Sequence, residues 1–405
     1  MRRSAGRTFA FSLALSAVLS AGAARSSIAA PAGLALRDVR ILSTRDGQLI
    51  AVPRGTVLVR DGMIAAAGEA IPIPEDFEVL ELAGRWVLPG FIDAHTQIGA
   101  RGECDEVSEA ITEDLRPLDA FDPWDEEIER ALLRGVTAVA LSPGDRNVVG
   151  GAVTVVKLLP ERVPVPVASR EAAVKASLGR AVLGSGSFPR YPTAPSGAVD
   201  LFGRWLRASP ARSAGEGAEK ARVPVLVRAE TRSQAEQALS LLSGAGRQAI
   251  LLAGRSLDRR ALDRLAPSCP VVVGPYDLGD HELLLSSAAA LETRGVPLAF
   301  SSGGERRDLL TSAVLAMRAG LSRAGALAAL TENPARLFGL EGRIGRVEPG
   351  AAADLVVWSG DPFTLSARVE LAIIEGEIAA RAPPLPQPPK LEAPKKPAKP
   401  EVVAR

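Results

Sequence analysis

The sequence predicts an α/β protein, with a (β/α)8 TIM-like barrel plus a small β-sandwich domain built from N- and C-terminal segments. From residue 89 onward, continuous apolar strands alternate with amphipathic helices, which is typical of a parallel sheet buried on both faces. Short alternating strands with Asp-Gly and Ala-Gly turns occupy residues 33–88. The length of 405 residues suits a barrel-sized domain and a smaller one.

Residues 1–30 have the pattern of an export signal. Arg2, Arg3 and Arg7 precede an apolar run, and small residues lead to a cleavage point after Ala30. The apolar run is too short and too rich in Ala and Ser for a membrane span. We therefore expect an exported, periplasmic or extracellular, mature chain without a membrane span; a retained N-terminal anchor is the alternative.

The remaining boundaries follow from changes in composition. Strands return near the C-terminus, so residues 33–88 and 345–380 are expected to form the small β domain together. Residues 89–344 are then the barrel. The Pro/Lys-rich segment 382–405 has almost nothing to bury and is expected to be an extended, solvated tail.

The segment FDPWDEEIERALLRG, residues 121–135, predicts the first helix of the barrel. Asp122 is the expected cap, Pro123 suits the first helical position, and Gly135 can end the helix. Further helices are expected in SQAEQALSLL, SLDRRALDRLA and HELLLSSAAALETRG. The strands between them are expected in VTAVALS, AVTVVKLL, VPVLVRA, QAILLA, PVVVG and VPLAFSS.

The composition excludes several classes of protein. Lys and Arg number 48 against 47 Asp and Glu, so a general affinity for nucleic acid or anionic membranes is not indicated. Aromatic residues make up only 4%, which argues against platforms for stacked bases. Cys104 and Cys269 cannot form a disulfide scaffold. We expect two small buried side chains; one bridge between them is the alternative.

Three segments together resemble the amidohydrolase superfamily of metal-dependent hydrolases. GRWVLPGFIDAHTQIG is similar to the first barrel strand of that family. LRPLDAFDPWDEEIERALLRGVTAVALSPGDRNVVGGAVTVVKL resembles the branch that includes imidazolonepropionases, and LTENPARLFGLEGRIGRVEPGAAADLVVWSGDPF resembles the family's C-terminal signature. The resemblance covers about residues 33–380 and implies hydrolysis of carbon–nitrogen bonds other than peptide bonds.

The resemblance also implies where metal ligands are expected. The family takes two histidines from the first strand, often a lysine from the fourth, one histidine each from the fifth and sixth, and an aspartate from the eighth, which serves as the base. In this chain His95 keeps the first position, Gln97 replaces the second histidine, and Lys157 falls near the lysine position. The other positions hold Glu230 or Arg228 on the fifth strand, Ala253 or Gly254 on the sixth, and Ser302 or Gly303 on the eighth.

This set of donors predicts a degenerate metal site. Catalytic zinc needs three protein ligands plus water, and the donors left are His95, Glu230, the Gln97 amide oxygen and Lys157 if carbamylated. The cofactor expected is therefore none, or a single zinc-like divalent metal that is weakly held. His95 is then either a relic held by packing and a hydrogen bond, or one ligand of a reduced site.

The loop LSPGDRNVVGG, residues 141–151, is glycine-rich but lacks the Gly-Lys-Ser/Thr order of a phosphate loop. The resemblance places it at the barrel mouth, where Asp145, Asn147, Gly150 and Gly151 can shape a pocket. His281, the second histidine of the chain, is expected on the surface or as a helix cap.

Three functions remain open from the sequence. The first is a pseudoenzyme, a barrel with a decayed metal site that binds a small molecule or a partner without efficient hydrolysis. The second is an active hydrolase with a mononuclear site on His95 and Glu230. The third is a structural role in which the tail is the attachment point. No feature of the sequence specifies an oligomeric state.

Overall fold

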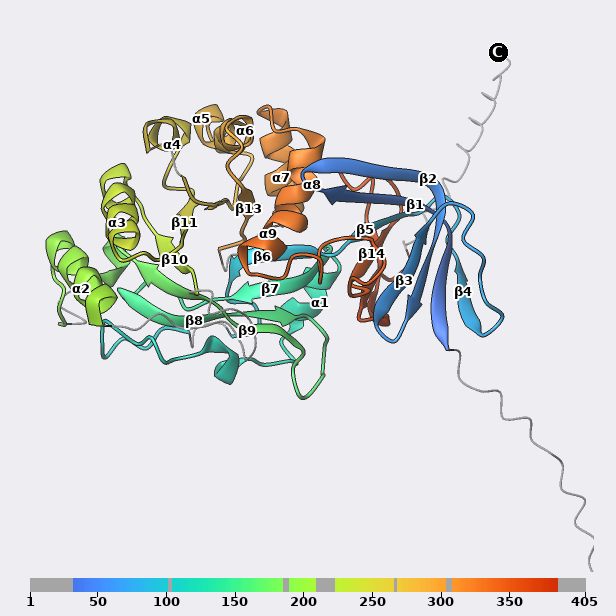
Figure 1. Cartoon of the computed structure of the whole chain (residues 1–405), viewed down its shortest axis with the longest axis horizontal. Coiled ribbons are helices and arrows are strands. Elements are labelled where there is room, and N and C mark those ends of the chain that lie inside the picture. Colours follow the sequence, from blue (N-terminus) through green and yellow to red (C-terminus); the bar gives the residue numbers. More distant parts are fainter. Residues whose placement is uncertain are drawn as a thin grey trace, which may run out of the picture. The chain divides into compact units, whose positions relative to one another are not determined.

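The computed structural model describes residues 32–100, 104–184, 189–208, 223–265, 268–303 and 308–384 (Figure 1). All of them belong to one compact unit, Ala32–Arg405. The export signal predicted over residues 1–30 and nearly all of the tail predicted over 382–405 lie outside the described residues. None of the described helices is both long and apolar enough to cross a membrane.

One eight-stranded sheet forms a nearly closed barrel, as the predicted fold class requires. Its strand order is β13-β12-β11-β10-β9-β8-β7-β6. Most residues of these strands are buried because both faces of the sheet are covered, although the first five residues of β9 are half-buried or exposed. Their bounds are β6 (Phe91–Thr96), β7 (Val136–Leu141), β8 (Val149–Lys157), β9 (Val167–Ser177), β10 (Val225–Arg228), β11 (Ala249–Gly254), β12 (Val271–Val273) and β13 (Leu298–Phe300).

The third barrel strand departs from the predicted parallel sheet. β8 runs antiparallel to both β7 and β9. Residues 142–148 join β7 to β8, and residues 158–166 join β8 to β9. Parallel neighbours need a crossover of about a dozen residues or more, usually a helix. The two links are too short for it, so the expectation of an all-parallel barrel is wrong at this strand.

The second sheet unites the two ends of the chain. Its order is β16-β15-β14-β5-β1-β2-β3, with β4 paired to β1. β14 lies antiparallel to β5, with Leu355 opposite Pro89. The two labels lie close together in Figure 1. The two-layer sandwich and the domain boundaries stay predictions. The bounds are β1 (Gly33–Arg45), β2 (Gln48–Arg60), β3 (Met63–Gly68), β4 (Phe77–Glu81), β5 (Trp86–Pro89), β14 (Leu355–Trp358), β15 (Val369–Ile374) and β16 (Glu377–Arg381).

Helices pack outside the barrel sheet; α3, for example, contacts β11 and lies beside α2 and α4 (Figure 1). Two short 3-10 helices, η1 (Pro117–Ala120) and η2 (Arg180–Val182), lie in loops. The α-helices are α1 (Glu126–Leu132), α2 (Pro195–Ala208), α3 (Arg232–Gly244), α4 (Arg259–Leu265), α5 (Glu282–Leu285), α6 (Ser287–Thr293), α7 (Leu309–Arg318), α8 (Arg323–Leu330) and α9 (Glu332–Leu337).

Helix α1 starts later than the sequence predicts. Its N-cap is Asp125, whose side chain accepts a hydrogen bond from the backbone N–H of Glu127 at 2.9 Å. Asp122 instead accepts from Trp124 N, in the turn before the helix. Both aspartates are good caps, so composition alone does not choose between them.

An apolar cluster drawn from every strand of the barrel sheet fills the barrel interior. Leu337, Phe338 and Ile344, from the end of α9 and the segment after it, pack on this cluster. The barrel is therefore a packed core rather than a channel. The strand residues of the cluster are Ile92, Ala94, Ala138, Ala140, Val153, Val155, Ala172, Ala173, Leu226, Ile250, Leu252, Val272 and Ala299.

A buried carboxylate joins the first and last strands of the barrel sheet. Asp93 Oδ1 accepts hydrogen bonds from the backbone N–H of His95 at 3.2 Å and of Ser302 at 3.1 Å. Nearby, Gly303 N donates to His95 O at 3.1 Å and Ser302 Oγ to Thr96 Oγ1 at 3.1 Å. Burial raises the pKa of Asp93 to about 6. Asp93 thus connects β6 to the segment after β13 in place of a strand ladder.

We expect Asp93→Asn to gain stability relative to the native chain as the pH rises. A carboxyl group whose pKa is raised stabilises the fold below its ordinary pKa of 3.8, and this contribution is lost as the pH rises through about 6. Asparagine stays neutral and keeps an acceptor oxygen for the two N–H groups. The relative gain between about pH 4 and about pH 8 is roughly 3 kcal/mol at most. Urea unfolding of both proteins at the two pH values measures it, and a constant difference would contradict the prediction.

Candidate functional site

The C-terminal ends of the parallel barrel strands bring several polar residues together. His95 lies near the end of β6 and Lys175 near the end of β9, while Arg228 and Gly254 are the last residues of β10 and β11. Active sites of barrel enzymes lie at this end of the strands. We call Lys175, Asp145, Arg228 and His95 the mouth cluster.

The centre of the mouth cluster is an ion pair between Lys175 and Asp145. The Lys175 side chain is 1% exposed, and its Nζ donates to Asp145 Oδ1 in a short contact and to Gly144 O at 3.4 Å. Burial by itself would raise the pKa of Asp145, but the charges of Lys175 and Arg228 hold it below its ordinary value. Asp145 is therefore a carboxylate at neutral pH.

Arg228 fills the space beside Gly254 that a side chain would need. A Cβ built on Gly254 would lie 1.9 Å from Arg228 Nη1. Arg228 Nη2 donates to Ser256 Oγ at 3.2 Å, and Nε lies 3.8 Å from Asp145 Oδ2. The family resemblance implies a histidine ligand on each of these adjacent strands. Arg228 and Gly254 instead supply a guanidinium group and the space that accommodates it.

His95 is buried without a hydrogen-bond partner for one ring nitrogen. The residue is 6% exposed, and Nε2 has no partner among the described residues. Burial, followed by the charge of Lys175, lowers the pKa of His95 to about 3. The imidazole is neutral at physiological pH. The charges of Lys175, Asp145 and Arg228 all act on the pKa of His95.

Gln97 and Glu230, two other predicted donors, have different surroundings. β6 ends at Thr96, so strand alternation does not carry from His95 to Gln97, which is half-buried in the following turn. The carboxylate of Glu230 accepts a hydrogen bond from Arg180 N at 2.9 Å and packs against Gly179. No described contact joins Glu230 to His95.

Lys157 is wrongly placed by the prediction. Its Nζ lies 3.1 Å from Asp354 Oδ2 and 2.8 Å from Glu375 Oε1, carboxylates that stand before β14 and after β15. Because β8 is antiparallel, its last residue lies at the opposite end of the barrel from the last residues of β9 and β10. The fourth barrel strand is β9, and its lysine is Lys175. A lysine inside the apolar run AAVKAS could have identified Lys175 as the lysine of that strand, but the sequence analysis did not consider it.

The predicted pocket loop divides into residues with different roles. Asp145 belongs to the mouth cluster. Asn147 is a structural residue, because its Nδ2 donates to Glu106 O at 2.6 Å and to Thr112 Oγ1 at 2.7 Å. Gly150 and Gly151 lie within β8 rather than in a loop. A Cβ on Gly151 would lie 2.3 Å from Leu115 O, so close packing requires glycine there.

One group of three carboxylates among the described residues has the spacing of a metal site, namely Asp46, Glu332 and Glu341. Arg336 and Arg346 already donate to Glu332 Oε1, at 3.1 and 2.9 Å, and both also reach Glu341. Burial would raise the pKa of Glu332, but hydrogen bonds from backbone N–H groups lower it. Two guanidinium groups already bind the carboxylates of Glu332 and Glu341, so these oxygens serve ion pairs and the cluster fits a metal ion poorly.

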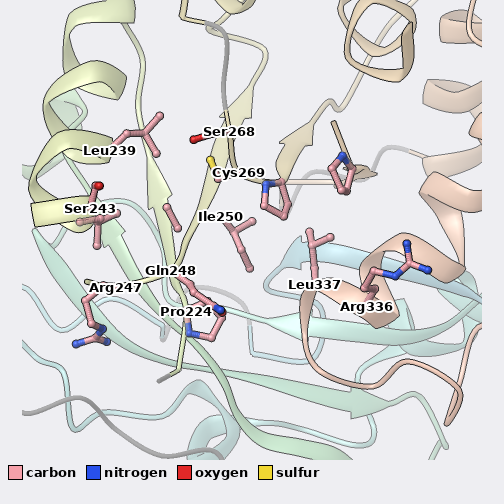
Figure 2. A pocket seen from close by; sticks show the side chains of 14 residues that line it. Pro224, Leu239, Ser243, Arg247, Gln248, Ile250, Ser268, Cys269, Arg336 and Leu337 are labelled. Carbon is pink, nitrogen blue, oxygen red and sulfur yellow. The ribbon is translucent and has the colours of Figure 1, made fainter. Parts of the chain in front are cut away.

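Two described pockets lie away from the mouth cluster. One of about 470 Å³ is lined by Pro224, Gln248, Cys269 and Leu337, among others (Figure 2). Pro224 precedes β10 and Gln248 precedes β11, so this pocket faces the N-terminal ends of the strands. The other, of about 540 Å³, includes Lys157. Neither is at the end where barrel enzymes carry their chemistry.

His281 and the cysteines agree with simple structural roles. His281 is the N-cap of α5, and its Nδ1 accepts a hydrogen bond from Leu284 N at 3.2 Å, which confirms the predicted capping role. Cys104 and Cys269 are half-buried and form no disulfide bond with each other, so the alternative of a bridge between them is wrong.

The chain is similar to known amidohydrolases. A sequence model described as the amidohydrolase family matches residues 299–380. An imidazolonepropionase from Rhizorhabdus wittichii is 26% identical over 379 residues, which cover 80% of this chain and 92% of that protein. A dihydroorotase from Anaeromyxobacter dehalogenans is 32% identical over 93 residues, 23% of this chain and 18% of that protein. The crystal structure of an amidohydrolase from Thermotoga maritima covers 86% of this chain and 100% of its own, with 26% identity and a TM-score of 0.72.

We expect Lys157→Met to destabilise the fold strongly without involving the mouth cluster. Asp354 is 3% exposed, so the substitution leaves a buried carboxylate without its cation, which costs roughly 3–5 kcal/mol. Arg162→Met is the matched control, because its ion pair with Glu377 is about half exposed, 46% and 57%, and contributes little. Urea unfolding compares the two. Equal costs would contradict a structural role for Lys157.

Gly254→Ala should be less harmful once Arg228 is shortened. In the single variant the new methyl group displaces the guanidinium, and alanine must adopt the left-handed φ of +56°. In an Arg228→Ala background only the backbone strain remains, so the two changes should couple by on the order of 1 kcal/mol.

Gly47→Ala provides the control for backbone strain, because Gly47 has φ +73° and nothing within 4 Å of a built Cβ. Its cost should not depend on Arg228. Strictly additive free energies for Gly254→Ala and Arg228→Ala would refute the proposed fit between the two residues.

Proposed function

We propose that this chain, which belongs to the imidazolonepropionase-like branch of the amidohydrolase superfamily, is an exported small-molecule-binding protein in which metal-dependent hydrolysis of carbon–nitrogen bonds is weak or absent. Its homologues are hydrolases of such bonds. The observation that carries the proposal is the Arg228 guanidinium in the space beside Gly254.

The mouth cluster does not fit a divalent metal. Zinc in a catalytic site needs three protein ligands, and the mouth cluster offers His95 Nε2 and a carboxylate already bonded to Lys175. Two unit charges about 4 Å apart interact by roughly 4 kcal/mol at a typical effective dielectric constant, and a dication doubles the repulsion from each cation. Lys175 and Arg228 therefore disfavour a metal ion where the family resemblance implies one.

The position expected to supply the base also argues against efficient hydrolysis. Ser302 stands at the eighth-strand position, and its side chain donates to Thr96 Oγ1 at 3.1 Å. A hydroxyl group held in this way is a poor base. Loss of a positioned general base typically lowers the rate by about 10²–10⁴-fold.

The alternative of an active mononuclear site on His95 and Glu230 has less support. Glu230 is bonded to Arg180 N, and His95 and Glu230 share no described contact. The third function, attachment through the tail, rests on the composition of residues 382–405 alone.

Metal analysis of the untagged mature protein, after incubation with zinc or manganese, tests the proposal. We expect far less than one ion per chain. The variant with Gln97→His, Arg228→His, Gly254→His and Ser302→Asp restores the ligand types and should bind more metal, provided that it folds by circular dichroism. Near-stoichiometric metal in the native chain, abolished by His95→Ala, would overturn the proposal.

A further inference from the structure

We infer that the mouth cluster is a binding site for the carboxylate group of a small molecule, with the Arg228 guanidinium as the principal contact. This inference rests on the proposed function, because it takes the cluster to be free of metal. It adds to that function the chemical class of the ligand and the residues that bind it.

Arg228 has a hydrogen-bond donor without a partner. Its Nη2 is bonded to Ser256, but its Nε is buried without a hydrogen-bond partner and lies 3.8 Å from Asp145 Oδ2, beyond hydrogen-bond distance. A guanidinium group presents adjacent N–H donors in a planar fork that matches the two oxygens of a carboxylate. A lysine at the same place would supply charge without this geometry.

His95 provides an independent indication of a ligand. It is 6% exposed, and its Nε2 has no partner among the described residues although Lys175, Asp145 and Arg228 surround it electrostatically. Leaving a buried polar atom without a partner is unfavourable. A neutral imidazole carries one N–H, so it can donate to a ligand oxygen.

The charges around the cluster favour a single negative charge. Within the mouth cluster Lys175 bonds to Asp145 and Arg228 Nε lies 3.8 Å from Asp145 Oδ2, so two cations face one carboxylate. Asp145 is already bonded to Lys175, which leaves Arg228 to meet an outside anion. One monocarboxylate balances the excess charge, whereas a phosphate dianion would exceed it.

Solvent reaches part of this group. The Asp145 side chain is 34% exposed and that of Arg228 19%, whereas Lys175 is 1% exposed. Asp145 and Arg228 are therefore the accessible members of the mouth cluster, and a small molecule can approach the guanidinium.

The two histidines of the chain allow a direct test by NMR. Protein labelled with ¹³C at histidine Cε1 is titrated with sodium acetate and, separately, sodium benzoate, with sodium chloride matching the ionic strength. We expect a saturable shift of the His95 signal. The His281 signal is the internal reference, because that exposed side chain caps α5. His95→Gln assigns the two signals.

Variants separate a carboxylate site from general charge effects. Arg228→Gln should weaken acetate binding at least about tenfold, since a hydrogen bond to a charged group contributes enough for such a change. Arg228→Lys should also weaken it, and Asp145→Asn should strengthen it by removing the internal carboxylate. Arg232→Gln, in the exposed pair with Glu236, should change nothing. Thermal unfolding checks that each variant folds.

The outcomes distinguish this inference from the proposed function. The inference is wrong if the His95 signal of metal-free protein does not shift with acetate or benzoate. It is also wrong if the folded Arg228→Gln variant binds them as well as the native chain. Neither outcome affects the proposed function. Saturation by inorganic phosphate but not by carboxylates overturns the choice of ligand. Stoichiometric metal in the same samples overturns the proposed function itself.

Discussion

The Lys175–Asp145 ion pair is the constraint around which the barrel mouth is arranged. An ammonium group that is 1% exposed must have a counter-charge, because leaving an ion buried and unpaired costs several kcal/mol or more. Asp145 supplies that charge from the loop between β7 and β8. The loop is itself held by Asn147, whose amide bonds to Glu106 and Thr112. Lys175 and Asp145 also act on the pKa of His95, whose lowering is caused first by burial.

The sequence was sufficient to predict the barrel and the pairing of the two chain ends. Their signals are local: apolar runs such as VTAVAL are buried along their whole length, and the strand before Pro89 pairs with the strand that starts at Leu355. The sequence alone also shows that positions 97 and 254, where the family resemblance implies histidine, hold glutamine and glycine. These predictions depend on residue type rather than on register.

The sequence did not reveal strand direction, and the lysine of the fourth barrel strand was therefore assigned wrongly. VTVVKLL and AAVKASL look alike as apolar runs that contain a lysine, yet Lys157 and Lys175 end at opposite ends of the barrel. Their separation depends on β8 running antiparallel, which follows from the short links on either side of it. An expectation of uniformly parallel strands assigns the wrong lysine, and no composition argument corrects it. The fit of Arg228 into the gap at Gly254 is a tertiary contact with no signal in either segment alone.

That fit bears on what the barrel mouth can bind. Arg228 could not occupy its place beside any residue larger than glycine at position 254, since even a Cβ would lie 1.9 Å from Nη1. Conversely, glycine at 254 beside a shorter residue at 228 would leave a void next to a buried carboxylate. The two residues are therefore compatible as a pair and poor choices separately. A site that only decayed would accumulate unrelated substitutions. The Arg228 side chain and the space at Gly254 are instead complementary, and together they place a cation at the barrel mouth.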